Sequence, residues 1–414
     1  MVTTREEGSR STGAIEKVFR EEYAVVFSGL VRVLGDFDEA EDAIAEAFAS
    51  AIEAWPKTGH PHNRAAWITT AARNAAVSAR RRRAVAARKE PEVEHLLSQP
   101  ADDADDRLRL IFTCCHPALA PEASIPFALR TTCGLSTSAV ARLLLVPEAT
   151  VAQRLVRAKR KIRESGISYA VPDADHLDAR VEAVLHVVYL MFTEGYAPAE
   201  EELVVNVELC EEAIRLARLL AQLLPTDGET RGLLALMLLH HARRGARSDD
   251  RGDIVPLDRQ DRSLWDRGAI GEGVRQLDEA LHRRGTGPYR IQAAIAALHA
   301  QATSPHETDW AQIASLYQEL YAREPSAPAA VSWCVALGMA LGPGDGLALL
   351  ERLAREGALA GSDRVHAARA DLLRRAGREA EARAAYAAAV AAARSAKERR
   401  FLERRASGLA RARG

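Results

Sequence analysis

The chain has 414 residues, of which 48% are hydrophobic and 27% charged, and its net charge is −1. That length allows two or three packed domains, and that composition excludes a chain that is disordered throughout. The near-neutral total hides basic runs at 73–89 and 154–163 and acidic runs at 36–53, 101–106 and 200–212. Whole-chain charge therefore identifies no partner.

Cysteine usage and hydropathy indicate the cellular compartment in which the protein is expected. Five cysteines, with Cys114 and Cys115 adjacent, show no disulfide framework. No apolar run approaches the roughly 20 residues that a membrane-spanning helix needs, and residues 1–13 lack the apolar core of a signal peptide. We therefore expect a cytoplasmic protein with no membrane partner.

Helical periodicity dominates the chain. Glycine and proline are rare inside long segments rich in alanine, leucine and arginine, whose apolar residues recur every three or four positions. This pattern predicts an all-α fold. Breaks rich in charged or turn-forming residues fall near 84–107, 165–176 and 243–262, and the last is expected to be a loop inside one domain. The expected division is a domain at 14–83, a linker at 84–107, a domain at 108–166 and a helical region at 177–414.

The first expected domain contains three helical patterns. The middle pattern places Glu39, Asp42 and Glu46 on one face and apolar residues on another. We call these three residues the acidic face and expect it to be a docking surface opposite a core stripe.

The third pattern of this domain ends in a basic run, which suits a phosphate backbone. Its basic residues are Arg73, Arg80, Arg81, Arg82 and Arg83. Trp55, which precedes this helix, is a candidate for contact with unstacked bases. Two alternatives stay open: Trp55 and Trp67 pack in a core, or the arginines only compensate a helix dipole.

Residues 135–163 are typical of two short helices joined by a turn. In the second helix Val151, Leu155, Ala158 and Ile162 form an apolar stripe that would pack on the first. The opposite side, called the reading face here, consists of Thr150, Gln153, Arg154, Arg157, Arg160 and Lys161. Such a face would present amide and guanidinium groups to base edges and phosphates in a major groove. The alternative is a solvated basic face on an ordinary helix hairpin.

Two residues mark the starts of these helices. Ser136 is the predicted N-cap of the first helix, since its hydroxyl can accept a hydrogen bond from a free backbone N–H group. Pro147 is predicted at the first position of the second helix, where a missing N–H group costs nothing.

The C-terminal region has one clear repeat-like unit, at 364–393. The small and aromatic positions of a tetratricopeptide hairpin are filled by Ala370, Gly377, Ala382, Tyr386 and Ala389. Stacked hairpins form a curved surface that can receive a peptide or a protein. The alternative is that these helices only brace the rest of the chain.

The order of these segments resembles that of bacterial RNA polymerase sigma factors of the extracytoplasmic-function type. The motifs that carry the resemblance are AEDAIAEAFASAIEAWP, AAWITTAARNAAVSARRRR and VPEATVAQRLVRAKRKIR. The segments at 105–119, 169–196, 260–270 and 287–300 resemble a subgroup with a long C-terminal extension related to tetratricopeptide repeats. The resemblance covers nearly the whole chain.

The resemblance implies a role for each segment. The acidic face would dock on core polymerase, and the segment from Trp55 to Arg83 would capture and help to melt the minus-ten promoter element. Thr150, Gln153, Arg154 and Arg157 would read the minus-thirty-five element, whereas Arg160, Lys161 and Arg163 would hold phosphates. The implied partners are core RNA polymerase and promoter DNA. A cytoplasmic regulatory protein at the C-terminal repeats is a further expectation.

No catalytic motif accompanies these segments. The Cys114, Cys115 and His116 run and the His240 and His241 pair lack zinc-ligand spacing, and no phosphate loop, dinucleotide fingerprint or nucleophile motif is present. We expect neither an enzyme nor a bound metal or cofactor. The alternative function is an autonomous helix-turn-helix DNA-binding regulator with a repeat scaffold, which would bind duplex DNA tightly without polymerase.

Overall fold

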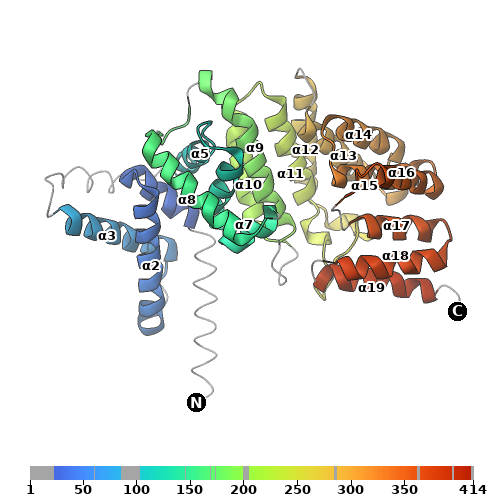
Figure 1. The fold of residues 1–414 in the computed structure, drawn as a ribbon, viewed down its shortest axis with the longest axis horizontal. Coiled ribbons are helices and arrows are strands. Elements are labelled where there is room, and N and C mark those ends of the chain that lie inside the picture. The colour runs from blue at the N-terminus through green and yellow to red at the C-terminus, as the bar shows by residue number, and fades with distance from the viewer. Residues whose placement is uncertain are drawn as a thin grey trace, which may run out of the picture. The chain divides into compact units, whose positions relative to one another are not determined.

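The computed structural model of the chain is built from helices (Figure 1). It describes residues 23–59, 61–84, 103–144, 146–167, 169–172, 174–198, 205–283, 287–360, 364–393 and 396–411. These ranges contain no strand, only an isolated bridge between Ser248 and Ile254. The all-α prediction is confirmed. The chain forms two compact units, 1–191 and 192–414, while the expected domain limits stay predictions.

The first unit opens with the three helical segments expected near its start. Residues 23–34 are helical, and α2 (Phe37–Thr58) and α3 (Arg64–Ala84) follow. A carboxylate oxygen of Asp36 caps α2 by accepting hydrogen bonds from the N–H groups of Asp38, at 2.8 Å, and Glu39, at 3.0 Å. The apolar stripe of α2 is buried, which leaves its acidic side toward solvent.

Four helices form the next part of this unit. They are α5 (Asp103–Cys114), α6 (Pro121–Cys133), α7 (Thr137–Leu144) and α8 (Glu148–Ser165). The expected linker therefore overlaps the start of α5, and residues 85–102 lie outside the described residues. The Ser136 hydroxyl accepts from the Ala139 N–H group at 3.1 Å, so the predicted N-cap is confirmed. Pro147 is the N-cap of α8 and not its first helical residue, because its ψ of 142° is extended.

A long helix, α9 (Ala174–Tyr196), begins in the first unit and ends in the second. The second unit continues with α10 (Val207–Leu223), α11 (Gly228–His241), α12 (Arg267–Leu281) and α13 (Pro288–Gln301). Between α11 and α12 the chain makes only single 3-10 turns, which confirms the expected loop near 243–262.

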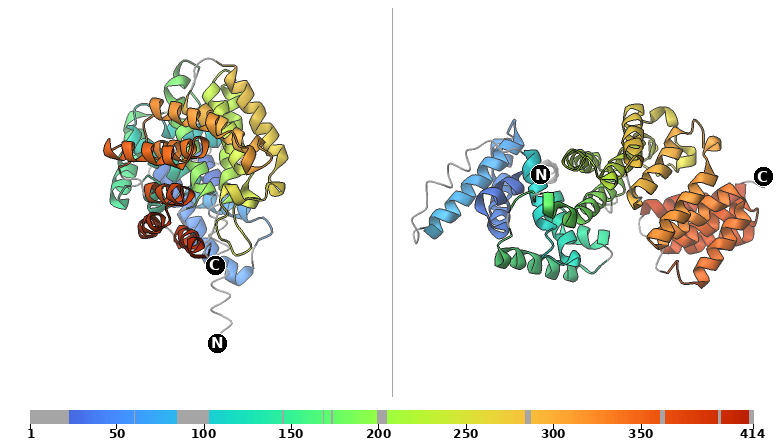
Figure 2. Two further views of the ribbon diagram at one scale, coloured as in Figure 1. Left: turned by 90° about the vertical axis from the view of Figure 1, so that its right-hand side faces the viewer. Right: turned by 90° about the horizontal axis from the view of Figure 1, so that it is seen from above.

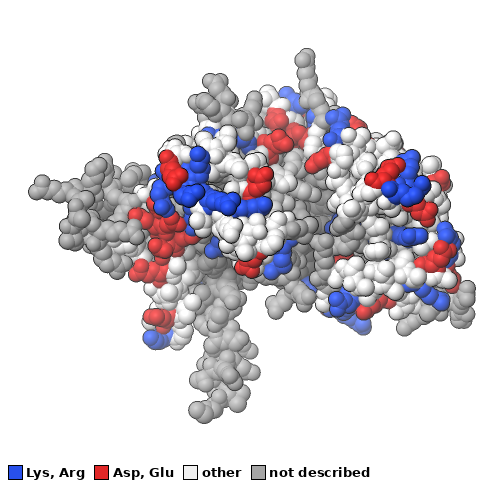
Figure 3. Space-filling model, viewed as in Figure 1, with Lys and Arg blue, Asp and Glu red and all other residues white. Residues whose placement is uncertain are grey.

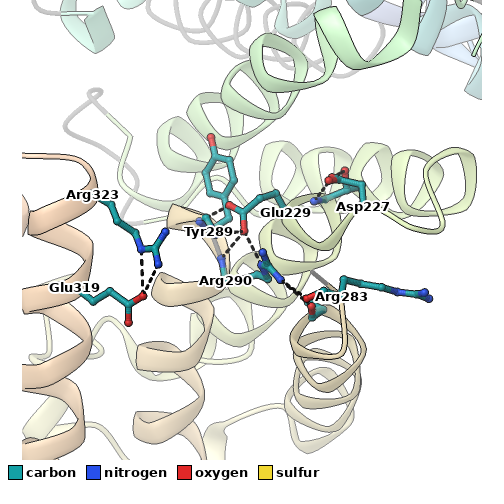
Figure 4. Close-up of polar contacts among 10 residues, drawn as sticks. Asp227, Glu229, Arg283, Tyr289, Arg290, Glu319 and Arg323 are labelled. Carbon is teal, nitrogen blue, oxygen red and sulfur yellow. Dashed lines mark hydrogen bonds and ion pairs between the residues drawn. The ribbon is translucent and has the colours of Figure 1, made fainter. Parts of the chain in front are cut away.

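Arginine side chains close the C-terminal ends of several helices in the second unit. Arg247 donates to the carbonyl oxygen of Tyr196 at the end of α9. Arg262 donates to the carbonyl of His299 at 2.9 Å in the last turn of α13. Arg290 donates to the carbonyl of Ala280 at 3.1 Å, near the end of α12, and to that of Arg283 at 3.2 Å, just beyond it. Figure 4 shows Arg290 beside Arg283. These guanidinium groups satisfy carbonyls that a helix leaves without partners, and their charge complements the helix dipole.

Six further helices complete the second unit. They are α14 (Trp310–Arg323), α15 (Ala327–Ala340), α16 (Pro343–Arg355), α17 (Arg364–Arg375), α18 (Glu379–Ala392) and α19 (Ala396–Arg411). Successive helices of this series lie side by side (Figure 2). Glycines allow α15 and α16 to approach closely, since a Cβ atom at Gly346 would lie 2.8 Å from the Cα of Gly338.

The predicted repeat unit at 364–393 is present as the hairpin of α17 and α18. Ala370, Ala382, Tyr386 and Ala389 are all buried in its core. Gly377 lies in the turn with a φ of +72°, a conformation that favours glycine. The small residues therefore lie where the paired helices meet, as the repeat pattern predicts.

Candidate nucleic-acid interface

Helix α8 has one buried and one exposed side. Val151, Ala158 and Ile162 are buried, and Leu155 is half-buried beside them. Val140 of α7 is completely buried, so the apolar stripe packs inward as expected. Because this side of α8 packs against the protein, the opposite side of the helix is directed to solvent.

The reading face lies on that opposite side of α8. Gln153, Arg157, Arg160 and Lys161 are exposed, whereas Thr150 and Arg154 are half-buried. The Nε of Arg160 lies 3.8 Å from a carboxylate oxygen of Glu164, and the two side chains are 70% and 64% exposed, respectively. Lys and Arg side chains gather over α8, and Asp and Glu side chains gather beside them over α2 (Figure 3).

The acidic face lies along α2. Asp42 and Glu46 are exposed, and Glu39 is half-buried in the first turn. Ile44 and Phe48, on the other side of the same helix, are buried. The sequence pattern therefore placed the acidic residues on an accessible surface.

The tryptophan and the arginine candidates for DNA contact, at the end of α2 and in α3, lie in different surroundings. Trp55 is 2% exposed, and its ring meets that of Trp67 edge to face, with ring centroids 5.6 Å apart. In this structure Trp55 therefore packs in a core, which is one of the alternatives left open by the sequence. Arg73 is half-buried. The backbone of Arg80, Arg81, Arg82 and Arg83 continues α3, and their side chains lie outside the described residues.

Sequence reasoning missed a contact between α8 and the start of α2. The Nζ of Lys159 lies 2.5 Å from a Glu41 carboxylate oxygen and 3.1 Å from one of Asp38. Arg163 pairs with Asp38 and lies 3.7 Å from Asp36. Burial opposes the charge of Lys159, but hydrogen bonds and attraction from the two carboxylates outweigh it and raise its pKa. We call these five residues the clasp.

Apolar and polar contacts elsewhere join the same two parts of the first unit. The ring of Phe37 in α2 lies 5.1 Å from that of Phe127 in α6, measured between centroids. Nε of Arg32 lies 2.9 Å from a carboxylate oxygen of Asp106, whose side chain is 2% exposed. Burial raises the pKa of Asp106, although Arg32 and Arg109 oppose the shift.

Tyr169 adds a further connection between these parts. Its hydroxyl lies within hydrogen-bond distance of two carbonyl oxygens, 3.0 Å from that of Ser28 and 2.7 Å from that of Asp106. Sequence periodicity carries no signal for these contacts, because the partners of Tyr169 are 141 and 63 residues away.

The cysteine and histidine runs form no recognisable metal centre. In the ranges that the structure describes, no three His, Cys, Asp or Glu side chains gather as a metal site would require. Cys114 is buried beside the Thr131 hydroxyl, at 3.3 Å, and burial raises the pKa of its thiol to about 12. Among the described helices none is both long and apolar enough to cross a membrane.

Three protein families match segments of the chain. Sigma-70 region 2 matches residues 18–85, and sigma-70 region 4 matches residues 109–162. A family of unknown function, DUF6596, matches residues 180–281. Region 2 therefore contains α2 and α3, and region 4 contains the second half of α5, α6, α7 and most of α8. No solved structure matches the chain.

Two relatives extend this comparison. An uncharacterized protein of Rhizobium meliloti is 40% identical over 410 residues, which cover 96% of each chain. A protein of Mycobacterium tuberculosis named probable ECF RNA polymerase sigma factor SigI is 28% identical over 155 residues, covering 35% of this chain and 53% of that protein. The chain belongs to the sigma-70 family, as a sigma factor of the extracytoplasmic-function type with a long helical C-terminal extension. Its fold and these matches support transcription initiation and DNA binding as its function.

Proposed function

We propose that this sigma factor directs core RNA polymerase to promoters with a minus-ten and a minus-thirty-five element. The observation that carries the proposal is the reading face of α8, which is fixed by a buried stripe and directed to solvent. In a major groove, Gln153 and Arg157 would bond base edges, and Arg160 and Lys161 would bond phosphates. Thr150 and Arg154 complete the face that contacts the bases.

Region 2 has two roles in this proposal. The acidic face of α2 binds core polymerase through ion pairs with basic side chains. The segment from Trp55 to Arg83 holds the minus-ten element, with Arg73 and Arg80 to Arg83 near phosphates. Pockets that accept a base only after unpairing can drive melting, because they bind the single strand alone. For Trp55 to stack on a base, its ring would first have to leave Trp67.

The C-terminal extension is proposed to regulate this activity in the cytoplasm by contact with another protein. Helical hairpins such as α17 and α18 support the proposal, because stacked hairpins expose an extended surface. The extension has no catalytic role in the proposal, and no cofactor is required.

Reconstituted transcription tests the promoter role. Purified core polymerase is supplied with wild-type protein or with Gln153→Ala plus Arg157→Ala, on a library of promoter fragments. We expect initiation at one shared two-part motif with wild type and its loss with the variant. Arg267→Ala is the matched control, since Arg267 is exposed in the second unit. Equal initiation by the variant at the same motif would contradict the proposed reading face.

Two further measurements separate the remaining alternatives. Tight, specific duplex binding by the chain alone, together with no binding to core polymerase, would favour the autonomous regulator. A chain that ends after Met191, where the first compact unit ends, tests the extension. Unchanged promoter-dependent transcription by that shorter chain, in cells and with purified polymerase, would remove a regulatory role.

A further inference from the structure

Basic side chains gather in the second unit where α9, α11 and α13 end. His240 lies in the last turn of α11, and Arg243 and Arg247 follow that helix. Arg262 lies in the loop before α12, and His299 lies in the last turn of α13. We call these five residues the basic cluster.

Tyr196, the last residue of α9, brings three members of the basic cluster together. Arg243 donates to the Tyr196 hydroxyl at 3.1 Å, and the central guanidinium carbon of Arg247 lies 3.5 Å from the centroid of the same ring. The centroid of the His240 ring lies 5.2 Å from that of Tyr196. The Nδ1 atom of His240 accepts from Arg243 at 2.6 Å. Two guanidinium groups and one imidazole therefore surround one phenol.

The other two members lie in the same electrostatic field. Arg262 donates to the carbonyl oxygen of His299 at 2.9 Å. Burial, together with the charges of Arg243 and Arg262, lowers the pKa of His299 to about 4. Burial and the charges of Arg243 and Arg247 lower the pKa of His240 well below its ordinary value. Both imidazoles are thus neutral at pH 7, and the charge of the cluster is that of its three arginines.

In the described part of the chain, no carboxylate forms an ion pair with these three arginines. Glu307 attracts Arg262 without pairing with it, and the Nε of Arg262 is buried without a hydrogen-bond partner. Arg290 shows the usual arrangement, because it is 4% exposed and pairs with Glu229. Arg243 is 9% exposed and has no such partner. A buried charge without a counter-charge is costly.

Helix carbonyls compensate only part of this charge. Arg247 donates to the carbonyl of Tyr196 at the end of α9, and Arg262 donates to a carbonyl in the last turn of α13. The negative end of a helix carries about half an elementary charge, so the ends of α9, α11 and α13 supply at most about 1.5 charges against three guanidinium groups. The remaining positive charge favours a bound anion.

We propose that the basic cluster is a binding site for a small phosphate-bearing anion. Guanidinium groups bind phosphate oxygens through charge-assisted, often paired hydrogen bonds, and a dianion offsets the remaining charge better than a monocarboxylate does. The burial of Arg243 favours a small molecule over the surface of a macromolecule. The phosphate can be inorganic phosphate or the phosphate group of a metabolite. This site gives the C-terminal extension a ligand of its own, independent of the reading face of α8.

Calorimetric titration of the full-length chain with inorganic phosphate tests the site, in chloride buffer of constant ionic strength. We expect saturable binding of one phosphate per chain. Acetate, a monoanion, should bind at least about tenfold more weakly. Phenyl phosphate separates the two sources of phosphate. Tighter binding of phenyl phosphate than of inorganic phosphate would indicate a metabolite, and weaker binding would indicate inorganic phosphate itself.

Substitution of Arg243 tests its place in the site. Arg243→Gln should weaken phosphate binding by roughly tenfold or more, because charge-assisted hydrogen bonds are lost. Arg243→Lys keeps the charge without the planar fork and should weaken binding by about threefold or more. The matched control is Arg275→Gln, which removes the same charge at an exposed position of α12 and should change nothing. Circular dichroism verifies that each variant is helical, and if Arg243→Gln is not, Arg243→Lys decides.

Nuclear magnetic resonance of histidine-labelled chain locates the phosphate without any substitution. At pH 7 the imidazole resonances of His240 and His299 should move together as phosphate is added, with the dissociation constant found by calorimetry. Those of His366, which is exposed on α17, should not follow this saturation. A purely structural role of the arginines would leave all three sets of resonances in place.

Two results would overturn the phosphate site. One is heat that does not saturate, with unmoved resonances of His240 and His299. The other is saturable binding that both Arg243 variants retain at full strength, since the phosphate would then bind elsewhere. Neither result depends on promoter recognition, so failure of this site and failure of the proposed transcriptional function are distinguishable.

Discussion

A carboxylate oxygen of Glu229 lies 3.0 Å from Nε of Arg290, whose side chain is only 4% exposed. Both oxygens of this carboxylate are used, since they also accept from the N–H groups of Gly287, at 3.1 Å, and Tyr289, at 2.9 Å (Figure 4). One side chain from the first turn of α11 thus compensates a buried charge and satisfies the first free N–H groups of α13.

We expect Glu229→Ala to lower the free energy of unfolding of the second unit by about 3 kcal/mol, because it leaves a buried guanidinium without its carboxylate. The matched control is Glu319→Ala, which breaks a pair with Arg323 at the same 2.9 to 3.1 Å spacing but with both side chains 44% and 46% exposed. That change should cost less than about 1 kcal/mol. Urea denaturation followed by circular dichroism measures both values, and equal losses would refute the assigned role of Glu229.

Two glycines in the first turn of α16 should respond oppositely to alanine. A Cβ atom at Gly346 would lie 2.7 Å from the carbonyl oxygen of Cys334 and 2.8 Å from the Cα of Gly338, so α15 and α16 would have to separate. We expect Gly346→Ala to lower the free energy of unfolding by about 1 to 3 kcal/mol. A Cβ at Gly344 would meet nothing within 4 Å, and Gly344→Ala should be neutral or slightly stabilising. Thermal unfolding of the two variants gives the comparison, and a lower midpoint for Gly344→Ala would be inconsistent with this account.

Substitutions on the reading face should separate recognition from general affinity. Arg157→Ala should relax preference at one promoter position and cost about 1 to 3 kcal/mol there, because a guanidinium reads a base edge. Lys161→Ala should weaken binding to every promoter and lower the salt slope by about one, as expected for loss of one phosphate contact. Binding of the polymerase complex to promoter variants at several salt concentrations measures both. The reverse pattern would exchange the two roles.

The second unit should lose stability in mild acid through His299. Burial, with the charges of Arg243 and Arg262, lowers the pKa of His299 to about 4. A lowered folded-state pKa means that its contribution is complete above the ordinary value near 6.5 and is lost as pH falls toward 4. Between about pH 7 and about pH 5 the loss is about 2 kcal/mol. His299→Gln should flatten this part of the plot of unfolding free energy against pH, measured by urea titrations. An unchanged plot would contradict the role assigned to His299.

Features set by local periodicity were predictable from the sequence. The buried stripe of α8 and the small residues of the hairpin at 364–393 follow from residues three and four apart, which share a helix face wherever the helix packs. The limit of this reasoning appears at Pro147, because one extended ψ angle moves a helix start by a residue. Boundaries depend on single dihedrals and not on a repeated pattern.

Long-range contacts were not predictable in this way. Lys159 lies off the exposed reading face, and nothing in its neighbourhood indicates that Glu41, 118 residues away, is its partner. Trp55 shows the same limit for side chains, because a tryptophan near a basic helix suits a base-stacking role and a packing role equally until its burial is known. The positions of helices in the chain were thus available from the sequence, while the pairing of their surfaces was not.

Tyr169 follows α8 on the connection toward α9, and its hydroxyl reaches carbonyls of both the first helical segment and α5. Tyr169 therefore attaches the connection between α8 and α9 to two other helical segments of the first unit. One hydroxyl group thus serves as donor to two helical segments, and a change at Tyr169 would remove the donor from the carbonyls of Ser28 and Asp106 at once.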